Sequence, residues 1–213
     1  MASNINELRV DYRRGTLDES SADANPFVLF QKWLDDAIAE NLSEPNAMIL
    51  ATAALDGKPS ARVMLLRNLD ERGFVFFTNY SSRKGKEIAQ NPFVSLVFFW
   101  QPLFRQIRVE GRIERVSAQE SDAYFDSRPR GNQLSAAASP QSQVIPHREF
   151  LETRVQELDA RFQKNVLRPA HWGGYRVVSD VIEFWQGRES RLHDRLRYTR
   201  TKDNAWKIER LAP

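Results

Sequence analysis

Apolar residues recur along the chain with two different periods, one typical of a helix and one typical of strands. Asn25 followed by Pro26 is a helix N-terminus signal, an N-cap residue with proline at the first helical position. The apolar residues that follow recur at helical spacing, at Phe27, Phe30, Leu34 and Ile38, and Trp33 and Ala37 widen this stripe. This pattern predicts a helix with one buried face, preceded by a flexible polar arm over residues 1–24.

Between residues 47 and 116 the pattern changes to strands. Asp56-Gly57 is a strong hairpin turn after the first apolar run. In the last run, Ile107, Val109 and Ile113 point to one face and the polar residues between them to the other. Strands are expected over residues 47–54, 60–67, 74–79, 93–100 and 103–116, with a turn near 70–73 and a short helix over 81–91. Sequential strands of this kind favour an antiparallel barrel over a parallel sheet.

Helices and strands alternate in the rest of the chain. Ser117 and Glu120 form a capping box for a helix that ends near residue 127. A segment of small residues over 135–142 leads to a second helix over 147–164. Strands are expected over residues 173–178, 181–185, 191–200 and 205–211. The sequence therefore predicts a mainly β fold with flanking helices, of the α+β class, as a single domain over residues 25–213.

The composition is that of a globular protein, with 41% hydrophobic and 28% charged residues. Cysteine is absent, which excludes disulfides and cysteine-ligated metal sites and fits a reducing cytoplasm. No apolar run approaches the roughly 20 residues of a membrane helix, so a cytoplasmic protein with no membrane partner is expected. The net charge is only +3, but the chain is rich in arginine, which suits phosphates and carboxylates. Nucleic acid and a phosphorylated small molecule are both partners that would explain this.

Candidate chemistry is limited to basic residues beside strand ends. The chain has neither a glycine-rich dinucleotide turn nor a P-loop, and its three histidines are too far apart in sequence to suggest a metal site. Ser82, Arg83 and Lys84 stand where a strand gives way to a helix, so backbone N–H groups and two cations could bind an anion there. The alternative is a capped surface helix with two solvated charges.

Other candidate residues have ordinary structural explanations. Arg62 and Arg67 bracket an apolar strand and are typical of solvated strand ends, and Arg128 is typical of a basic loop. Trp185 fits the core as well as it fits a binding site, and His193 is typical of a hydrogen-bonded structural histidine. Taken singly, these residues leave both explanations open.

The order of the motifs along the chain resembles the pyridoxine 5′-phosphate oxidase family. The resemblance rests on Arg62-Val-Met-Leu-Leu-Arg67, Phe77-Thr78-Asn79, Ser82-Arg83-Lys84, Ser127-Arg128-Pro129-Arg130, Gln141-Ser142, Phe184-Trp185-Gln186-Gly187 and Arg191-Leu-His-Asp-Arg195. It extends from the cluster at residues 9–12 to the closing residues 206–213, so it covers nearly the whole chain. The Arg-Leu-His-Asp-Arg string is its most specific part.

This resemblance implies an FMN-binding split barrel, a Greek-key antiparallel β-barrel with flanking helices. It also implies a homodimer whose FMN sites lie at the subunit interface. The implied reaction is the oxidation of pyridoxine 5′-phosphate or pyridoxamine 5′-phosphate to pyridoxal 5′-phosphate. A hydride passes from C4′ of the substrate to N5 of FMN, and O2 reoxidises the flavin to give hydrogen peroxide. The protein then mainly supplies orientation and charge.

The family pattern also implies roles for individual residues. The FMN-binding residues would be Arg62, Val63, Met64, Leu65, Leu66, Arg67, Phe77, Thr78, Arg83, Lys84, Gln106, Gln141, Ser142, Trp185 and Arg195. The substrate-binding residues would be Arg9, Val10, Asp11, Tyr12, Arg67, Tyr124, Arg128, Asn132, Arg191, Leu192 and His193. Arg83 and Lys84 would bind the FMN phosphate, and the catalytic residues Arg191 and His193 would hold the pyridine ring against the flavin.

Three positions depart from the family pattern. Arg67 stands where lysine is usual, Asn132 where serine is usual, and Phe77 where tyrosine is often found. Arg67 keeps the positive charge, Asn132 a hydrogen-bond donor and Phe77 the aromatic ring. The changes therefore bear on affinity and substrate preference more than on the reaction.

Two rival functions are weighed against this one. The related flavin oxidase of phenazine biosynthesis shares the barrel and the Arg-Leu-His ending, and Arg67 slightly favours it. The intact turn at 127–130 and the arm at 9–12 favour a phosphate-bearing vitamer instead. A rival of another class is a non-catalytic split barrel that binds a flavin or a nucleic acid. Nucleic-acid binding needs a continuous basic stripe with interleaved aromatics, whereas basic and acidic residues alternate over 108–114, so no nucleic-acid partner is expected.

Overall fold

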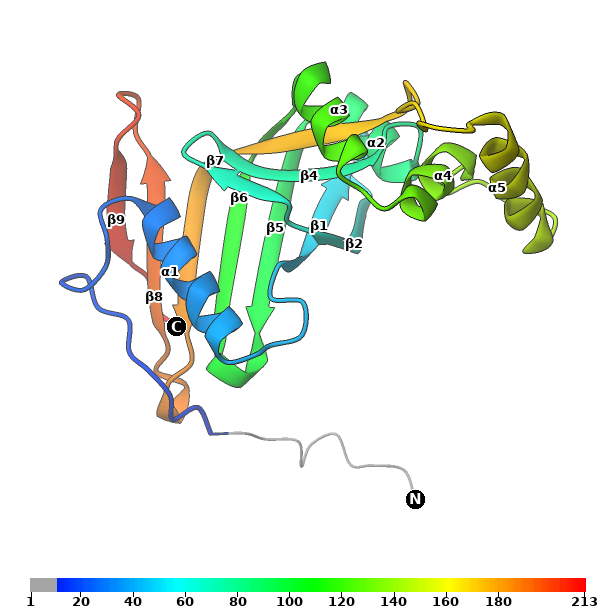
Figure 1. Cartoon of the computed structure of the whole chain (residues 1–213). Helices are drawn as coiled ribbons and strands as arrows, with labels where there is room; N and C mark the ends of the chain where they lie inside the picture. The colour runs from blue at the N-terminus through cyan, green and yellow to red at the C-terminus, as the bar shows by residue number, and fades with distance from the viewer. Residues whose placement is uncertain (1–10) are drawn as a thin grey trace. The chain divides into compact units, whose positions relative to one another are not determined.

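The computed structural model describes residues 11–213, and within them nine strands form one sheet (Figure 1). The strands are β1 (Ala47–Ala53), β2 (Pro59–Leu65), β3 (Asn68–Asp70), β4 (Gly73–Asn79), β5 (Phe93–Trp100), β6 (Arg105–Arg115), β7 (Trp172–Gln186), β8 (Asp194–Arg200) and β9 (Trp206–Arg210). The sheet order is β2-β1-β5-β6-β7-β4-β3, while β8 pairs with β7 and β9 with β8. Strand β7 is antiparallel to β4 along its first half and to β8 along its second.

Helices occupy three regions of the described chain. They are α1 (Pro26–Ala39), α2 (Arg83–Gln90), α3 (Ala118–Asp126), α4 (Arg130–Ala138) and α5 (Glu149–Arg161), with short 3₁₀ turns η2 (Gln101–Leu103) and η3 (Glu189–Arg191). None of these helices is both long and apolar enough to span a bilayer. The mainly β architecture with flanking helices is the one that the apolar pattern predicted.

The chain divides into two compact units. Unit 1 comprises residues 11–49, 95–110 and 179–213, and unit 2 comprises residues 50–94 and 111–178. Strands β1, β5, β6 and β7 run from one unit into the other. Each unit has its own hydrophobic contacts and its own group of candidate site residues.

The core of unit 1 forms where α1 packs on the sheet (Figure 1). Asn25 caps the first turn of the helix, as predicted. Phe30 contacts Phe98 with ring centroids 4.9 Å apart, and Trp33 contacts Phe184 at 5.2 Å, both edge to face. The buried positions recur at helical spacing, so the apolar face of α1 is the one that holds it on the strands.

The last turn of α1 departs from the predicted stripe. Ile38 is 54% exposed, whereas Ala37 is fully buried. The stripe that faces the strands runs through Phe30, Trp33 and Ala37, which places Ile38 on the solvent side of the helix.

In unit 2 a smaller apolar cluster joins α3 and α4 to the start of β7. It consists of Phe125, Leu134, Val166 and Trp172. The predicted capping box is present, because Ser117 accepts from the Glu120 N–H and the Glu120 side chain accepts from the Ser117 N–H. This cluster fixes the helices that surround the cavity described below.

Some elements differ from the sequence prediction. Helix α4 was expected to be a basic turn followed by irregular chain, and β3 stands partly where a turn was expected. The strands predicted over 173–178 and 181–185 are one continuous strand, β7, that passes through the polar pair Ser179-Asp180 at the boundary of the two units. Strand β8 starts at Asp194 instead of residue 191, because Ser190 and Arg191 have left-handed backbones with φ of 55° and 62°.

Candidate active site

Unit 2 contains a cavity of about 670 Å³. Many of the residues predicted to bind FMN or the substrate phosphate line it, namely Val63, Met64, Leu65, Arg67, Phe77, Thr78, Lys84, Tyr124, Arg128, Asn132 and Gln141. They come from β2, from Arg67 just after it, from β4 and from the first turn of α2. The others lie on α3 and α4 and in the segments that directly follow these two helices. The fold therefore gathers residues as far apart in sequence as Val63 and Gln141 into the wall of one cavity.

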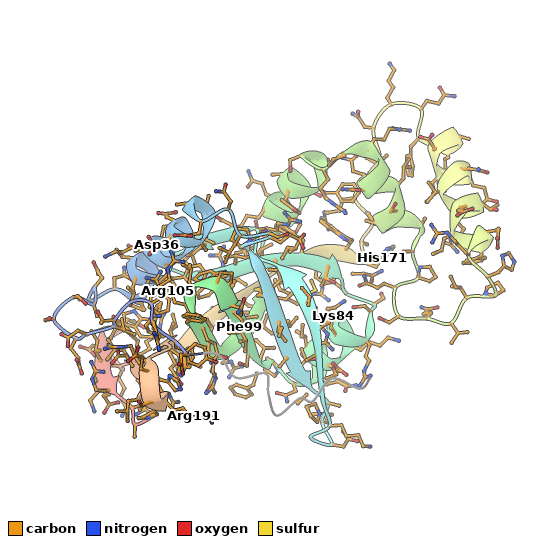
Figure 2. All side chains as sticks on the ribbon, turned by 90° about the horizontal axis from the view of Figure 1, so that it is seen from below. Asp36, Lys84, Phe99, Arg105, His171 and Arg191 are labelled. Carbon is orange, nitrogen blue, oxygen red and sulfur yellow. The ribbon has the colours of Figure 1, made fainter. Side chains whose placement is uncertain are left out.

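Lys84, labelled in Figure 2, brings a buried positive charge to this cavity. Its Nζ donates to Gln141 Oε1 (3.1 Å) and Thr78 Oγ1 (3.3 Å), and it lies 3.5 Å from Ser82 Oγ. None of these partners carries a charge. Burial, followed by repulsion from Arg62, lowers the pKa of Lys84. A buried ammonium group with neutral partners is suited to bind an anion that enters the cavity.

Arg128 adds a second cation with an unsatisfied donor. Its Nη1 is buried and has no hydrogen-bond partner within residues 11–213, and burial lowers its pKa. The guanidinium lies 4.7 Å from the ring centroid of Trp172. Phe77 stacks on Tyr124 with centroids 3.9 Å apart. Because an unpaired buried donor is costly, this side chain is suited to an anionic ligand beside stacked aromatic rings.

Arg62 and Arg83 face the buried carboxylate of Glu87 and do not line the cavity. Oε1 of Glu87 accepts from Arg83 Nε (2.8 Å), and Oε2 accepts from Thr52 Oγ1 (2.5 Å) and Ser60 Oγ (2.6 Å). Oε2 also lies 3.4 Å from Arg62 Nη2. Burial by itself raises the pKa of Glu87, but the two hydroxyl hydrogen bonds and then that of Arg83 lower it to about 2. This carboxylate ties β1 and β2 to α2, the helix that carries Lys84.

Glu87 and Trp172 were not predicted as site residues. Glu87 follows Arg83 at i+4 spacing, which was the one sequence signal for its contact, and nothing in the sequence indicated that Trp172 lines the cavity. Four predicted FMN-binding residues of unit 2 are not among the lining residues: Arg62, Leu66, Arg83 and Ser142. Their roles stay predictions.

The other predicted site residues belong to unit 1, and four of those that the structure describes gather at the end of β7. The rings of Trp185 and His193 lie 4.6 Å apart, and Tyr12 is 5.5 Å from His193 and 5.7 Å from Trp185. Trp185 stands opposite Arg195 in the β7–β8 ladder, and Arg195 Nε donates to Glu183 Oε1 (2.8 Å). Trp185 and Arg195, predicted to bind the cofactor, are therefore neighbours of two residues predicted to bind the substrate, Tyr12 and His193.

Arg191, labelled in Figure 2, stands in a strained turn two residues before His193. Two successive non-glycine residues with left-handed backbones, Ser190 and Arg191, are rare and often mark a functional site. The remaining predicted residues of this unit within the described chain are Asp11, Gln106 and Leu192. Two predicted substrate residues lie outside the described residues: Arg9 and Val10.

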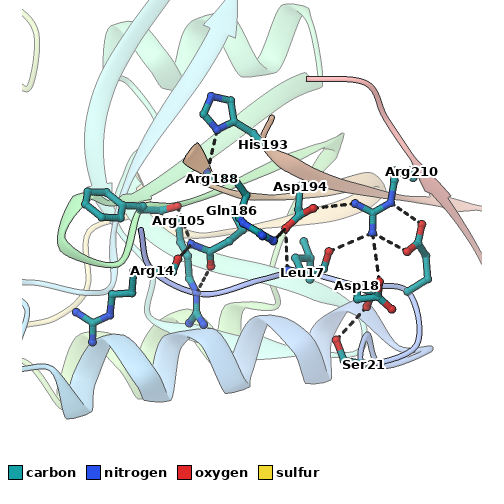
Figure 3. A network of polar contacts seen from close by, with 12 residues as sticks. Arg14, Leu17, Asp18, Ser21, Arg105, Gln186, Arg188, His193, Asp194 and Arg210 are labelled. Atoms are coloured by element: carbon teal, nitrogen blue, oxygen red, sulfur yellow. Dashed lines mark hydrogen bonds and ion pairs between the residues drawn. The ribbon is translucent and has the colours of Figure 1, made fainter. Parts of the chain in front are cut away.

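Gln186 anchors the chain segment that carries Tyr12 (Figure 3). Its Nε2 donates to the carbonyls of Arg14 (2.7 Å) and Leu103 (3.1 Å), and its Oε1 accepts from Arg105 Nε (3.0 Å). Arg105 also pairs with Asp36 of α1 at 2.6 Å, and both residues are labelled in Figure 2. The amide at the end of β7 thus fixes the segment next to the aromatic cluster.

Comparison with protein-family models gives two matches along the chain. A model described as pyridoxamine 5′-phosphate oxidase matches residues 34–162. A second, described as the pyridoxine 5′-phosphate oxidase C-terminal dimerisation region, matches residues 172–213. The second match contains Trp185 and His193 of the aromatic cluster, and the strained turn of unit 1.

Curated relatives resemble the chain over its full length. A pyridoxine/pyridoxamine 5′-phosphate oxidase of Burkholderia vietnamiensis is 55% identical over 213 residues, which cover 99% of this chain and 100% of that protein. The protein of the same name from Nostoc punctiforme is also 55% identical and covers 100% of both chains.

Solved structures resemble it as well. PhzG from Burkholderia lata, in complex with tetrahydrophenazine-1-carboxylic acid, superposes with a TM-score of 0.88 at 33% identity, over 94% of this chain and 99% of that one. A pyridoxamine 5′-phosphate oxidase-related FMN-binding protein from Nostoc punctiforme superposes with a TM-score of 0.68 at 16% identity, over 86% of this chain and 97% of that one. The second likeness concerns the fold alone.

The buried carboxylate of Glu87 predicts a specific pH dependence of stability. Its pKa is about 2 in the folded chain against an ordinary 4.5, so its contribution is fully present above about pH 4.5 and is lost as the pH falls towards 2. We expect Glu87→Gln to be less stable than the wild type at pH 7 and to lose less stability on acidification. Denaturant unfolding of the apoprotein at several pH values measures this, with the exposed Glu114→Gln as control. Parallel pH profiles of the wild type and Glu87→Gln would contradict the assignment.

Proposed function

The chain belongs to the pyridoxine/pyridoxamine 5′-phosphate oxidase family, and we propose that the cavity of unit 2 binds the phosphate groups of FMN and of the substrate. The chain is an FMN-dependent oxidase that converts pyridoxine or pyridoxamine 5′-phosphate to pyridoxal 5′-phosphate. Its fold is the FMN-binding split barrel. The family, the fold, the cofactor and the reaction implied by the sequence motifs are thus confirmed.

The observation that carries the phosphate assignment is the set of cations on one cavity. Arg67, Lys84 and Arg128 all line it. Lys84 has only neutral hydrogen-bond partners, and Arg128 Nη1 has none within residues 11–213. Two phosphate groups supply the negative charge and the acceptors that these side chains lack. The donor set therefore fits both the cofactor and a phosphorylated substrate.

Within this proposal the cations divide between two ligands. Lys84 binds the FMN phosphate, and Arg67 and Arg128, with Asn132, bind the phosphate of the substrate. FMN held by these residues would supply the hydride acceptor for C4′ of the substrate, with O2 as the final oxidant. Arg191 and His193 orient the pyridine ring, and Tyr12 helps to exclude water from it. The protein contributes mostly orientation and electrostatics.

We further propose a homodimer in which each FMN site lies at the subunit interface. Two facts support this: the predicted FMN-binding residues divide between unit 1 and unit 2, and the family model that matches residues 172–213 describes a dimerisation region. In the proposed dimer, the unit 2 cavity of one subunit is completed by the Trp185–His193 cluster of the other. A cytoplasmic location, a flexible arm over residues 1–24 and a single domain over 25–213 stay predictions.

The phenazine oxidase remains the rival with a specific observation in its favour. PhzG shares the fold at a TM-score of 0.88, but its identity to this chain is 33%, against 55% for the vitamer oxidases. The ligand named in that complex carries a carboxylate and no phosphate. The cations on the cavity favour a substrate with a phosphate group. A non-catalytic barrel is disfavoured, because the full-length relatives are oxidases.

The first test is the activity of the purified protein. We expect a yellow protein that releases FMN, and O2 consumption with pyridoxine 5′-phosphate or pyridoxamine 5′-phosphate but not with unphosphorylated pyridoxine. The phosphate is required because the cationic side chains proposed to bind the substrate have no other anion to bind. Activity on a reduced phenazine carboxylate, with none on either vitamer phosphate, would contradict the proposal.

A pair of substitutions separates the proposed roles of the two units. Arg191→Ala should lower turnover by about 100-fold through lost orientation of the substrate while FMN stays bound. Lys84→Met should weaken FMN binding by about 10-fold or more, through loss of a charge-assisted hydrogen bond, and should change riboflavin binding far less. Flavin fluorescence titration of the apoprotein and steady-state O2 uptake measure the two effects. Loss of FMN from Arg191→Ala would mean that this residue is misassigned.

A further inference from the structure

Asp194 follows His193 directly and accepts hydrogen bonds from three separate parts of unit 1 (Figure 3). Its Oδ2 accepts from Arg188 Nη1 (2.8 Å) and from the Leu17 N–H (3.1 Å), and its Oδ1 accepts from Arg210 Nη1 (3.0 Å). The side chain is only 16% exposed. Burial by itself raises the pKa of Asp194, but these hydrogen bonds, led by that of the Leu17 N–H, lower it overall. The group is therefore an ionised and almost buried acceptor.

The hydrogen bond between Asp194 and Arg188 links Asp194 indirectly to His193. The backbone N–H of Arg188 donates to Nδ1 of His193 (3.1 Å). An Nδ1 that accepts a hydrogen bond carries no proton, so the neutral ring has its proton on Nε2. Burial, followed by the charge of Arg191, lowers the pKa of His193, which favours that neutral form. The position of Arg188 thus sets both the tautomer and the orientation of the ring.

The hydrogen bond between Asp194 and the Leu17 N–H links Asp194 to the segment that carries Tyr12. Leu17 is buried, and its carbonyl accepts from Arg210 Nη2 (3.1 Å) while its N–H donates to Asp194. Arg210 also pairs with Glu19 at 2.6 Å. These bonds attach Leu17, which lies five residues after Tyr12, to β8 and β9. Tyr12 itself lies edge-on to His193.

We propose that Asp194 is a positioning residue that holds His193 and the Tyr12 segment in register with each other. One carboxylate fixes the loop that donates to His193, through Arg188, and the segment that carries Tyr12, through Leu17. This inference rests on the proposed function, in which His193 and Tyr12 contact the substrate. It assigns no contact with substrate to Asp194 itself.

The test uses Asp194→Asn in the full-length protein, because this change keeps the shape and removes the charge. Nitrogen NMR of ¹⁵N-histidine protein reports the tautomer directly, and the chain has only three histidines to assign. In the wild type we expect His193 to have one protonated and one unprotonated ring nitrogen, with the proton on Nε2. In Asp194→Asn the two shifts should move towards each other as the tautomers exchange, and trypsin should cleave faster after Arg13 and Arg14.

Kinetics give an independent readout. Loss of charge-assisted bonds should raise the KM for pyridoxine 5′-phosphate by about 10-fold, while FMN affinity changes by less than about 2-fold. The control is Asp180→Asn, an exposed acid on β7 of the same unit, which should behave as the wild type. Arg188→Ala should disturb the His193 tautomer but not the trypsin cleavage, and Arg188→Lys should restore the tautomer.

Two outcomes would overturn the proposal. One is an Asp194→Asn protein whose thermal midpoint falls while its His193 shifts and KM match the wild type, since the role would then be structural only. The other is an unchanged rate of cleavage after Arg13 and Arg14. A wild type that neither binds FMN nor consumes O2 would instead remove the proposed function, and the NMR and proteolysis results would still decide the position of His193.

Discussion

A buried positive charge is costly unless an anion balances it, and this constraint separates two groups of cations in unit 2. Lys84 and Arg128 face one cavity, and neither forms an ion pair with a carboxylate among the hydrogen-bonded partners seen within residues 11–213. By contrast, Arg62 and Arg83 are satisfied by Glu87, whose pKa of about 2 keeps it ionised. The chain neutralises some of its cations internally and leaves Lys84 and Arg128 without a carboxylate partner among the described residues. In the proposed function, phosphate groups of the ligands balance these two charges.

The same unit contains a set of stacked aromatic rings beside these cations. Phe77, Tyr124 and Trp172 are stacked nearly parallel, and Arg128 lies over the last of them. Unit 1 contains different groups: an aromatic cluster, a histidine whose Nδ1 accepts from a backbone N–H and a strained arginine turn. In the proposed function, phosphate binding and ring orientation belong to different units, and the proposed dimer supplies both to each site.

The sequence predicted local features of the fold well and long-range contacts poorly. The N-cap at Asn25 and the alternation along β6 depend on neighbouring residues, and both were identified from them. The continuity of β7 through Ser179-Asp180 was missed, because a polar pair inside a strand resembles a turn until its partners are known. Helix α4 was missed for a similar reason, since its glycine and small residues lack a clear apolar stripe.

The candidate site shows the same limit. The residues alone left Lys84 open between an anion site and a solvated surface, and only the resemblance of the ordered motifs implied a flavin. The partners of the site residues were beyond either approach. Glu87 meets hydroxyls on two strands, and Asp194 meets a backbone N–H near the other end of the chain. Such contacts depend on the tertiary fold, so no sequence spacing indicates them.

The most direct test of the account is subunit complementation between Lys84→Met and Arg191→Ala. Assayed at an FMN concentration below the Kd of Lys84→Met, each variant alone should have little activity, the first through lost cofactor and the second through lost turnover. If each site combines unit 2 of one subunit with unit 1 of its partner, a mixed dimer has one intact site and one doubly impaired site. Random mixing of equal amounts by dissociation and reassociation should then restore about a quarter of the wild-type O2 uptake with pyridoxine 5′-phosphate. Activity that stays at the level of the separate variants, in samples shown to contain mixed dimers, would contradict the shared site.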